Sequence, residues 1–415
     1  MSIPKRTKIL ADAEIAGTSN PTPPSRLAET IANNDDLLIE ILLRVPISSL
    51  LKFKSVSKHW LSVISNPKFS LRRNSITVPV SGLFFPRSLR SINEISKYDF
   101  VNLVDRPYSH VKAPLRSLPF ADDPSNTEII QSCRGLLLCF TYFPRGLDRK
   151  NDYAVYNPTT KQYTKLPPIS QIDDGTKICG LSLAFDPSNS PHYKVVCVRN
   201  GKDSMYQIQI YSSETRRWRF SGGSFDFESF DIEFHGGVYC NGCLHWISVW
   251  EDSAFFNVEE ERFSLLPMPP PPEDFWNHDH KHRYFGESRG HLHLIDTICD
   301  QTSRFDVLEM EMDYSGWFVK FRVDLSDIPM AFPEIVRREF DDKIKRHMYM
   351  FSLLCIVRSE FDEDSYLLLQ IPGKVIRYNF KNRTFFELCD YETDSTIPEN
   401  AWPPAHQYFE SLALV

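Results

Sequence analysis

The sequence predicts a mainly β protein with a small α domain, in which three N-terminal helices precede a β-propeller of about six blades. Three observations support this fold class. Helical periodicity is confined to residues 33–74, and the rest of the chain consists of alternating or aromatic runs that are typical of strands. A hairpin pattern also recurs along those runs, at spacings of about 45 to 55 residues.

Composition divides the chain into three parts. Residues 1–32 hold four prolines among Ser, Thr, Ala and Gly, and we expect a disordered tail there. Residues 33–74 form the predicted helical domain, and residues 75–415 form the predicted β domain. Residues 1–74 carry 11 Lys and Arg against 6 Asp and Glu, whereas the remainder has a net charge of -12. This asymmetry predicts different partners for the two segments.

The first helix is expected to begin at Asp35 or Asp36, either of which can cap it, and to end at Pro46. Its apolar residues recur at the i, i+3, i+4 and i+7 positions of one face: Leu38, Ile41, Leu42 and Val45. Further apolar residues make this helix apolar almost all round, and so small a domain cannot bury them all by itself. The surplus predicts a partner or a neighbouring domain.

Two more helices are expected in the helical domain. Ser48 or Ser49 can cap the second. The third is expected over residues 56–64, before the Asn-Pro step at residues 66–67 stops it. Three short helices therefore fit into this segment.

One hairpin pattern is repeated four times in the β domain, with an aromatic residue near the end of the first strand and a polar turn after it. The four copies occupy residues 155–167, 210–218, 256–267 and 378–388. Small sheets repeated at this spacing are typical of a β-propeller, because stacked blades bury the faces that one small sheet cannot bury alone. The length of the β domain allows six or seven blades, and long loops such as residues 267–282 favour six.

A ring of blades must hide its first and last strand edges. The chain ends in an apolar run, residues 408–415, and we expect this segment to close the ring by pairing with residues 81–85. In a strand, Leu412 and Leu414 would lie on one face and Phe409 on the other. A frayed tail is the alternative.

Several classes of protein are disfavoured by composition. No apolar stretch reaches about 18 residues, and the basic start of the chain has only a brief apolar pair behind it, so no membrane partner and no secretory signal are expected. Nine cysteines without an export signal predict reduced thiols and a location in the cytoplasm, the nucleus or both. The acidic β domain lacks a basic stripe, which argues against nucleic acid as a partner.

The helical domain resembles the F-box family. The motif residues are, in chain order, Asp36-Leu37-Leu38, Glu40-Ile41-Leu42, Arg44-Val45-Pro46, Ser49-Leu50-Leu51, Val56-Ser57-Lys58, Trp60 and Asn66-Pro67-Lys68-Phe69. Three positions depart from the family pattern: Asn33-Asn34 stands where Leu-Pro is usual, Val45 stands for Leu, and Ser57 stands for Cys. The first of these departures removes an apolar contact that the family usually gives to its adaptor.

The β domain resembles the F-box-associated domain, a kelch-like propeller that is common in large plant F-box families. The residues that carry this resemblance are 132–138, the hairpin at 156–167, Ala184-Phe185-Asp186-Pro187 with Tyr193-Lys194-Val195-Val196, Asn241-Gly242-Cys243-Leu244-His245-Trp246, and 408–412. Together the two resemblances cover residues 33–415.

The resemblance implies a substrate-recognition subunit of an SCF-type cullin-RING E3 ubiquitin ligase, with no catalysis and no cofactor of its own. The F-box would bind a Skp-family adaptor, and through it a cullin, while the propeller would hold an unknown protein target. The residues expected to support adaptor binding, by contact or by holding the helices together, are Leu37, Leu38, Ile41, Leu42, Pro46, Leu50, Leu51, Val56 and Trp60. Two alternatives stay open: a scaffold that binds the same adaptor without delivering a degraded target, and a propeller hydrolase.

Two groups of possible metal ligands occur in the β domain. Cys240-x-x-Cys243-x-His245 looks like half of a zinc site, but no second Cys-x-x-Cys exists, and in a single strand Cys240 would face away from the other two residues. Alternating His278, His280 and His282 in a loop could bind stray metal. No nucleophile-elbow, metalloprotease or phosphate-loop motif occurs. We therefore predict no metal site and no catalytic residue.

Overall fold

The computed structural model describes residues 34–74, 79–86, 98–103, 126–142, 152–169, 177–200, 205–225, 232, 234–248, 253–270, 281–298, 303–341, 344–390 and 405–415. The chain divides into two compact units, residues 1–45 and 46–415. The boundary between them lies inside the segment that the sequence predicts as one helical domain. The predicted disordered tail, residues 1–32, lies outside the described residues.

Helix α2, Asp35–Leu42, belongs to the first unit. Its N-cap is Asn34, whose Oδ1 accepts a hydrogen bond of 3.1 Å from the backbone N–H of Leu37. The predicted caps, Asp35 and Asp36, lie in the first turn instead, where their charge complements the helix dipole. One of the residues that departs from the F-box pattern therefore starts the helix.

Three helices follow in the second unit: α3 (Ile47–Phe53), α4 (Lys58–Ile64) and α5 (Pro67–Asn74). Pro46 precedes α3 and no side chain caps it, so the predicted cap at Ser48 or Ser49 is wrong. Ser57 caps α4, because its Oγ accepts a hydrogen bond from the N–H of Trp60 at 3.1 Å. The sequence did not predict α5, because the Asn-Pro step at 66–67 was interpreted only as a stop. Proline also suits the first turn of a helix, where its missing N–H costs nothing.

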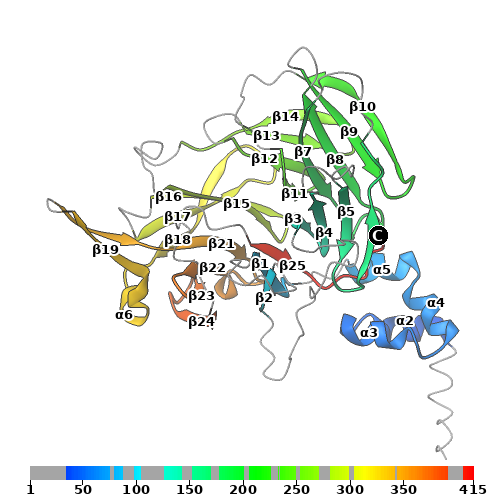
Figure 1. Cartoon of the computed structure of the whole chain (residues 1–415). Helices are drawn as coiled ribbons and strands as arrows, with labels where there is room; N and C mark the ends of the chain where they lie inside the picture. The colour runs from blue at the N-terminus through cyan, green and yellow to red at the C-terminus, as the bar shows by residue number, and fades with distance from the viewer. Residues whose placement is uncertain are drawn as a thin grey trace, which may run out of the picture. The chain divides into compact units, whose positions relative to one another are not determined.

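Six sheets form a β-propeller, and the predicted blade number is confirmed (Figure 1). Within the described residues the first blade has three strands and the other five have four strands each, all paired with antiparallel neighbours. In order of blades, the strands are β25 (His406–Tyr408), β1 (Gly82–Pro86) and β2 (Tyr98–Asn102); β3 (Thr127–Cys133), β4 (Leu136–Thr141), β5 (Asp152–Asn157) and β6 (Gln162–Lys165); β7 (Lys177–Ala184), β8 (Lys194–Asn200), β9 (Tyr206–Ser212) and β10 (Arg217–Phe225); β11 (Val238–Cys240), β12 (Cys243–Trp246), β13 (Ser253–Asn257) and β14 (Arg262–Leu266); β15 (Lys281–Ser288), β16 (His291–Ile298), β17 (Arg304–Met310) and β18 (Trp317–Asp324); and β21 (Ser352–Val357), β22 (Tyr366–Ile371), β23 (Lys374–Asn379) and β24 (Phe385–Asp390).

A further segment, which the sequence did not predict, lies between the fifth and sixth blades. It consists of α6 (Ile328–Ala331), the 3-10 helix η3 (Pro333–Ile335), and a separate two-stranded sheet of β19 (Val336–Asp341) and β20 (Ile344–Tyr349). Ile328 and Ile335 are fully buried in the core between these two blades. The insertion is therefore anchored by its own apolar side chains.

The recurring hairpins of the sequence join the third and fourth strands of four blades. In three of them one Asn opens the turn and its Oδ1 accepts two backbone N–H groups: Asn157, Asn257 and Asn379. In all four, the fifth residue of the turn adopts a positive φ: Lys161, Arg216, Glu261 and Arg383. One turn geometry thus explains the repeated pattern.

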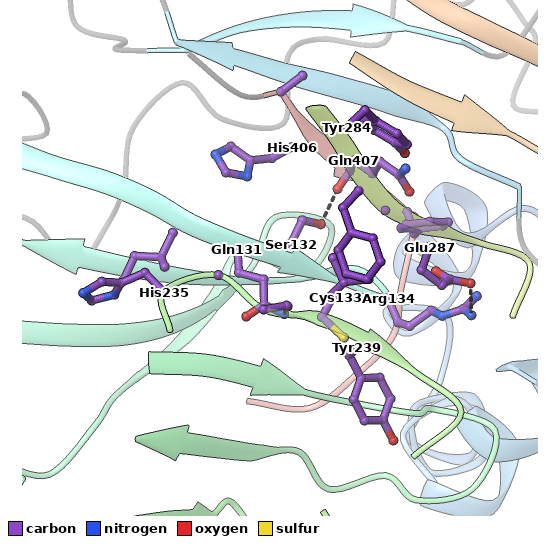
Figure 2. Close-up of a pocket in the computed structure, with 18 of the residues that line it drawn as sticks. Gln131, Ser132, Cys133, Arg134, His235, Tyr239, Tyr284, Glu287, His406 and Gln407 are labelled. Carbon is purple, nitrogen blue, oxygen red and sulfur yellow. Dashed lines mark hydrogen bonds and ion pairs between the residues drawn. The ribbon is translucent and has the colours of Figure 1, made fainter. Parts of the chain in front are cut away.

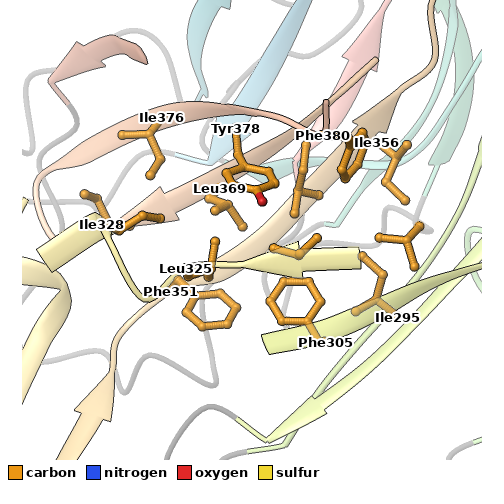
Figure 3. Close-up of a cluster of buried hydrophobic side chains, with 14 of the residues drawn as sticks. Ile295, Phe305, Leu325, Ile328, Phe351, Ile356, Leu369, Ile376, Tyr378 and Phe380 are labelled. Atoms are coloured by element: carbon orange, nitrogen blue, oxygen red, sulfur yellow. The ribbon is translucent and has the colours of Figure 1, made fainter. Parts of the chain in front are cut away.

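The core of the propeller consists of one cluster of buried apolar side chains between each pair of neighbouring blades. Between the fifth and sixth blades, Ile295 and Phe305 belong to the same buried cluster as Leu369 and Tyr378 (Figure 3). The cluster that contains Leu83 joins the first blade to the sixth. The ring of blades is therefore closed by packing as well as by strand pairing.

The two ends of the propeller meet in the first blade, where β25 pairs with β1 (Figure 1). The prediction that the C-terminal segment pairs with residues 81–85 is confirmed, but the pairing residues are His406–Tyr408 rather than 408–415. Residues 409–415 are not a strand, so Leu412 and Leu414 do not share a strand face: Leu412 is buried and Leu414 is exposed. The alternative of a frayed tail is wrong.

Candidate functional site

Helix α2 has an exposed apolar face. Leu38 and Leu42 are buried, whereas Leu37 and Ile41, four residues apart, are each 47% exposed. Residues at i and i+4 lie on the same side of a helix, so these two side chains form one apolar stripe that faces solvent. Large apolar side chains that adjoin one another at a surface are typical of a contact with another protein.

The predicted residues of the second unit also differ in how far they are exposed to solvent. Leu50 is buried and Val56 is 59% exposed. Leu51 and Trp60 are half-buried, and the ring of Trp60 meets that of Phe53 edge to face at 5.4 Å. Leu61, which is not among the predicted residues, is also exposed. Leu61 is not one of the F-box motif residues, so the resemblance did not point to it.

Of the nine predicted adaptor-binding residues, the structure places some at the surface and others in the interior. The exposed residues are Leu37, Ile41, Pro46 and Val56. The half-buried residues are Leu51 and Trp60, and the buried residues are Leu38, Leu42 and Leu50. For the first helix the sequence could not separate these classes, because that helix is apolar on nearly every side.

A cavity of about 320 Å³ lies among the first strands of several blades in the propeller (Figure 2). Residues of β3, β11, β15, β21 and β25, with their adjoining turns, line it. The side chain of Gln131 connects β3 to two neighbouring segments: its Nε2 donates to the carbonyls of Leu183 in β7 and of Gly237, just before β11, and its Oε1 accepts from the N–H of Leu183. One side of the cavity is therefore lined by hydrogen-bonded backbone.

An ion pair joins two blades on opposite sides of the ring at this cavity. Arg134 follows β3 of the second blade, Glu287 lies in β15 of the fifth, and the Nη2–Oε1 distance between them is 2.7 Å (Figure 2). Burial alone would lower the pKa of the Arg134 guanidinium, but the charge of Glu287 beside it raises that pKa above its usual value. The Arg134 guanidinium is therefore charged at neutral pH.

The comparisons with known proteins match both halves of this architecture. The family model described as "F-box domain" matches residues 34–72, and the one described as "F-box associated beta propeller domain" matches residues 90–289. The chain is 37% identical to "F-box protein At5g07610" of Arabidopsis thaliana, over 100% of both chains. The chain belongs to the F-box protein family.

More distant relatives carry the same family name. "F-box protein At5g49610" of Arabidopsis thaliana is 28% identical over 91% of this chain and 96% of its own length. "F-box protein At4g19940" of the same plant is 27% identical over 61% of this chain and 63% of its own length. This F-box protein is therefore of the plant type with an F-box-associated propeller, as its motifs predicted.

The half zinc motif of this F-box protein is a buried hairpin. A single strand is expected over residues 240–245, but Asn241 and Gly242 form a two-residue turn with positive φ angles, and Cys240 lies opposite Cys243 across it. Cys240 therefore shares a sheet face with Cys243 and His245, and the prediction that it faces away is wrong.

The protein itself satisfies both ring nitrogens of His245. Its Nδ1 lies 3.0 Å from the carbonyl oxygen of Val238, and its Nε2 lies 2.7 Å from the hydroxyl oxygen of Tyr314. Burial raises the pKa of the Cys240 thiol, which keeps it protonated. Within the part of the chain that the structure describes, no group of three His, Cys, Asp or Glu side chains is arranged to hold a metal ion.

The second group of histidines is only partly described. His278 and His280 lie outside the described residues, whereas His282 lies in β15 and its ring stacks near that of Phe351 at 6.1 Å. His282 is thus part of a blade rather than of a loop. Among the described helices, none is long and apolar enough to cross a membrane.

Proposed function

We propose that this F-box protein is the substrate-recognition subunit of an SCF-type cullin-RING E3 ubiquitin ligase. The observation that carries the proposal is the exposed apolar stripe of Leu37 and Ile41 on a helix that the F-box family model matches. An adaptor of the Skp family would cover this stripe and would connect the chain to a cullin. The adaptor would bury apolar side chains that are otherwise exposed to water. Burial of each of these side chains would contribute about 1 kcal/mol or more to the free energy of binding.

The nine predicted residues take two roles in this proposal. Leu37, Ile41, Pro46 and Val56 would contact the adaptor, since each is exposed. The buried residues Leu38, Leu42 and Leu50 would act indirectly, because truncating a buried apolar side chain leaves a cavity around it. Half-buried Leu51 and Trp60 combine both roles.

The propeller would hold the protein target, and the chain would perform no covalent chemistry itself. By tethering the target beside a separate conjugating enzyme, the complex raises the local concentration of the reacting groups. The eight described cysteines are all free, which supports a reducing compartment, the cytoplasm or the nucleus.

Affinity capture of the full chain from plant cells, followed by mass spectrometry, tests the proposal. The test variant carries Leu37→Asp and Ile41→Asp, and the matched control carries Leu265→Asp and Phe386→Asp, two exposed apolar residues of the propeller. The test variant should lose adaptor and cullin, keep the target, and let the target accumulate in the cell. The control should keep adaptor and cullin.

Two results would contradict this function. Equal capture of adaptor by the test variant and the control would overturn the F-box assignment. Loss of adaptor without any protein accumulating would favour the scaffold that binds the adaptor but delivers no degraded target.

A further inference from the structure

The ion pair of Arg134 and Glu287 leaves several of its hydrogen-bonding atoms unused. Oε1 of Glu287 accepts both of the bonds that this side chain makes, from Arg134 Nη2 at 2.7 Å and from the N–H of Gly290 at 2.6 Å. No described residue bonds Oε2 of Glu287, or Nε and Nη1 of Arg134. Within the described part of the chain, one acceptor atom and two donor atoms of the pair are therefore unused.

Both side chains of the pair are partly open to solvent. The side chain of Arg134 is 30% exposed and that of Glu287 is 11% exposed, and both line the cavity. The volume of about 320 Å³ lies at the lower end of the range for ligand sites. Such a volume suits one side chain or a comparably small group, and it does not suit a folded segment.

The charge of the pair restricts what it can bind. Arg134 and Glu287 neutralise each other, so an added carboxylate or ammonium group would leave one charge uncompensated in a partly desolvated site. A neutral group that carries an acceptor and a donor next to each other would use the free atoms without this cost. A carboxamide is such a group, since its oxygen accepts and its NH₂ donates.

We propose that the cavity binds the side-chain carboxamide of an Asn or Gln residue of the target protein, with its oxygen on Arg134 and its NH₂ on Glu287. The assignment of the ligand to a target rests on the proposed function, whereas the chemistry of recognition rests on the cavity alone. Because Arg134 and Glu287 contact each other directly, the bound group would lie beside their ion pair at the cavity.

The test uses four blocked pentapeptides of alanine that carry Gln, Glu, Lys or Ala at the centre, titrated into the purified full-length chain. Saturation-transfer NMR on the central side chain reports binding at this cavity. The wild-type chain should bind the Gln peptide about tenfold more tightly than the other three, which is the effect of one hydrogen bond to a charged group. All four peptides share the same backbone amides, so only the central side chain differs.

Two variants should change the preference in opposite directions. Glu287→Gln leaves the charge of Arg134 uncompensated, so the chain should then prefer the Glu peptide. Arg134→Gln leaves the charge of Glu287 uncompensated, so that variant should prefer the Lys peptide. The control is Lys165→Gln, which breaks an exposed ion pair with Asp152 on the outer strand β6 and should keep the wild-type order.

The melting temperature of each variant shows that it is folded, and the order of preference is read only from folded protein. If the wild-type chain binds the Ala peptide as well as the Gln peptide, or if both variants keep the wild-type order, the inference is wrong. Because no adaptor is present, this failure would leave the proposed ligase function untouched. Failure of adaptor capture, conversely, would leave the peptide result standing.

Discussion

Gly82 and Tyr408 face each other across the pairing of β1 with β25, so the first and last strands of the propeller lie side by side. The N–H of Ser81 also donates to the carbonyl of Tyr408 at 2.8 Å. A side chain at Gly82 would meet the ring of Phe100, since a Cβ there would lie 2.3 Å from it. Glycine at this position therefore leaves room for the ring of Phe100, which meets that of Tyr408 edge to face at 5.6 Å.

Asn157 should contribute more to stability than its counterparts in the other hairpins. Its Nδ2 donates to the carbonyls of Ser411 at 3.1 Å and Ala413 at 2.8 Å, and so fixes the C-terminal segment. Asn157→Ala would leave two buried carbonyls without a donor and should lower the free energy of unfolding by about 2 to 4 kcal/mol. Asn257→Ala removes only the turn bonds and should cost about 1 kcal/mol. Denaturant unfolding measures both, and equal losses would show that the C-terminal contacts add nothing.

Gly135 and Gly242 occupy the same position in their turns but different surroundings. Both have positive φ, +91° and +81°, so Ala at either position is strained by about 1 kcal/mol. A Cβ at Gly135 would lie 2.4 Å from that of Ser411, whereas nothing lies within 4 Å of one at Gly242. Gly135→Ala should therefore destabilise the chain by about 1 to 3 kcal/mol more than Gly242→Ala. Similar melting temperatures for the two variants would contradict the packing of the C-terminal segment on this turn.

The buried histidines make stability depend on pH. Burial lowers the pKa of His406 to about 4, below the value of 6.5 for an unfolded histidine. Between these values the unfolded chain binds the proton and the folded chain does not, so stability falls as the pH is lowered from 6.5 to 4. His406→Gln should reduce the slope of unfolding free energy against pH in this window by about 1.4 kcal/mol per pH unit. An unchanged slope would show that His406 titrates normally in the folded chain.

Local features of this fold could be predicted from the sequence, and features that depend on the ring could not. The repeated hairpins were predictable, because the Asn at the start of each turn and the strands beside it are neighbours in sequence. Ring closure was predictable in outline from the need to cover strand edges. Its register was not, since the apolar run after Tyr408 packs against Asn157 and Thr159 without forming a strand.

In the candidate sites, too, local motifs could be predicted from the sequence, whereas features that depend on the folded chain could not. The F-box residues were predictable from a motif, but their separation into exposed Ile41 and buried Leu38 required the helices to be placed. The pair of Arg134 and Glu287 gave no signal, because its partners are 153 residues apart and only the ring of blades brings them together. The shared face of Cys240 and Cys243 was missed because a two-residue turn was interpreted as continuous strand.

The affinity of a purified Skp-family adaptor for the full-length chain tests the central claim most directly. Ile41→Asp places a charge in the exposed stripe of α2 and should weaken binding by about thirtyfold or more, without changing the melting temperature. Leu265→Asp, at a residue that is 65% exposed on the propeller, should leave the dissociation constant unchanged. A wild-type dissociation constant for Ile41→Asp would contradict the account of this chain as an adaptor-bound receptor.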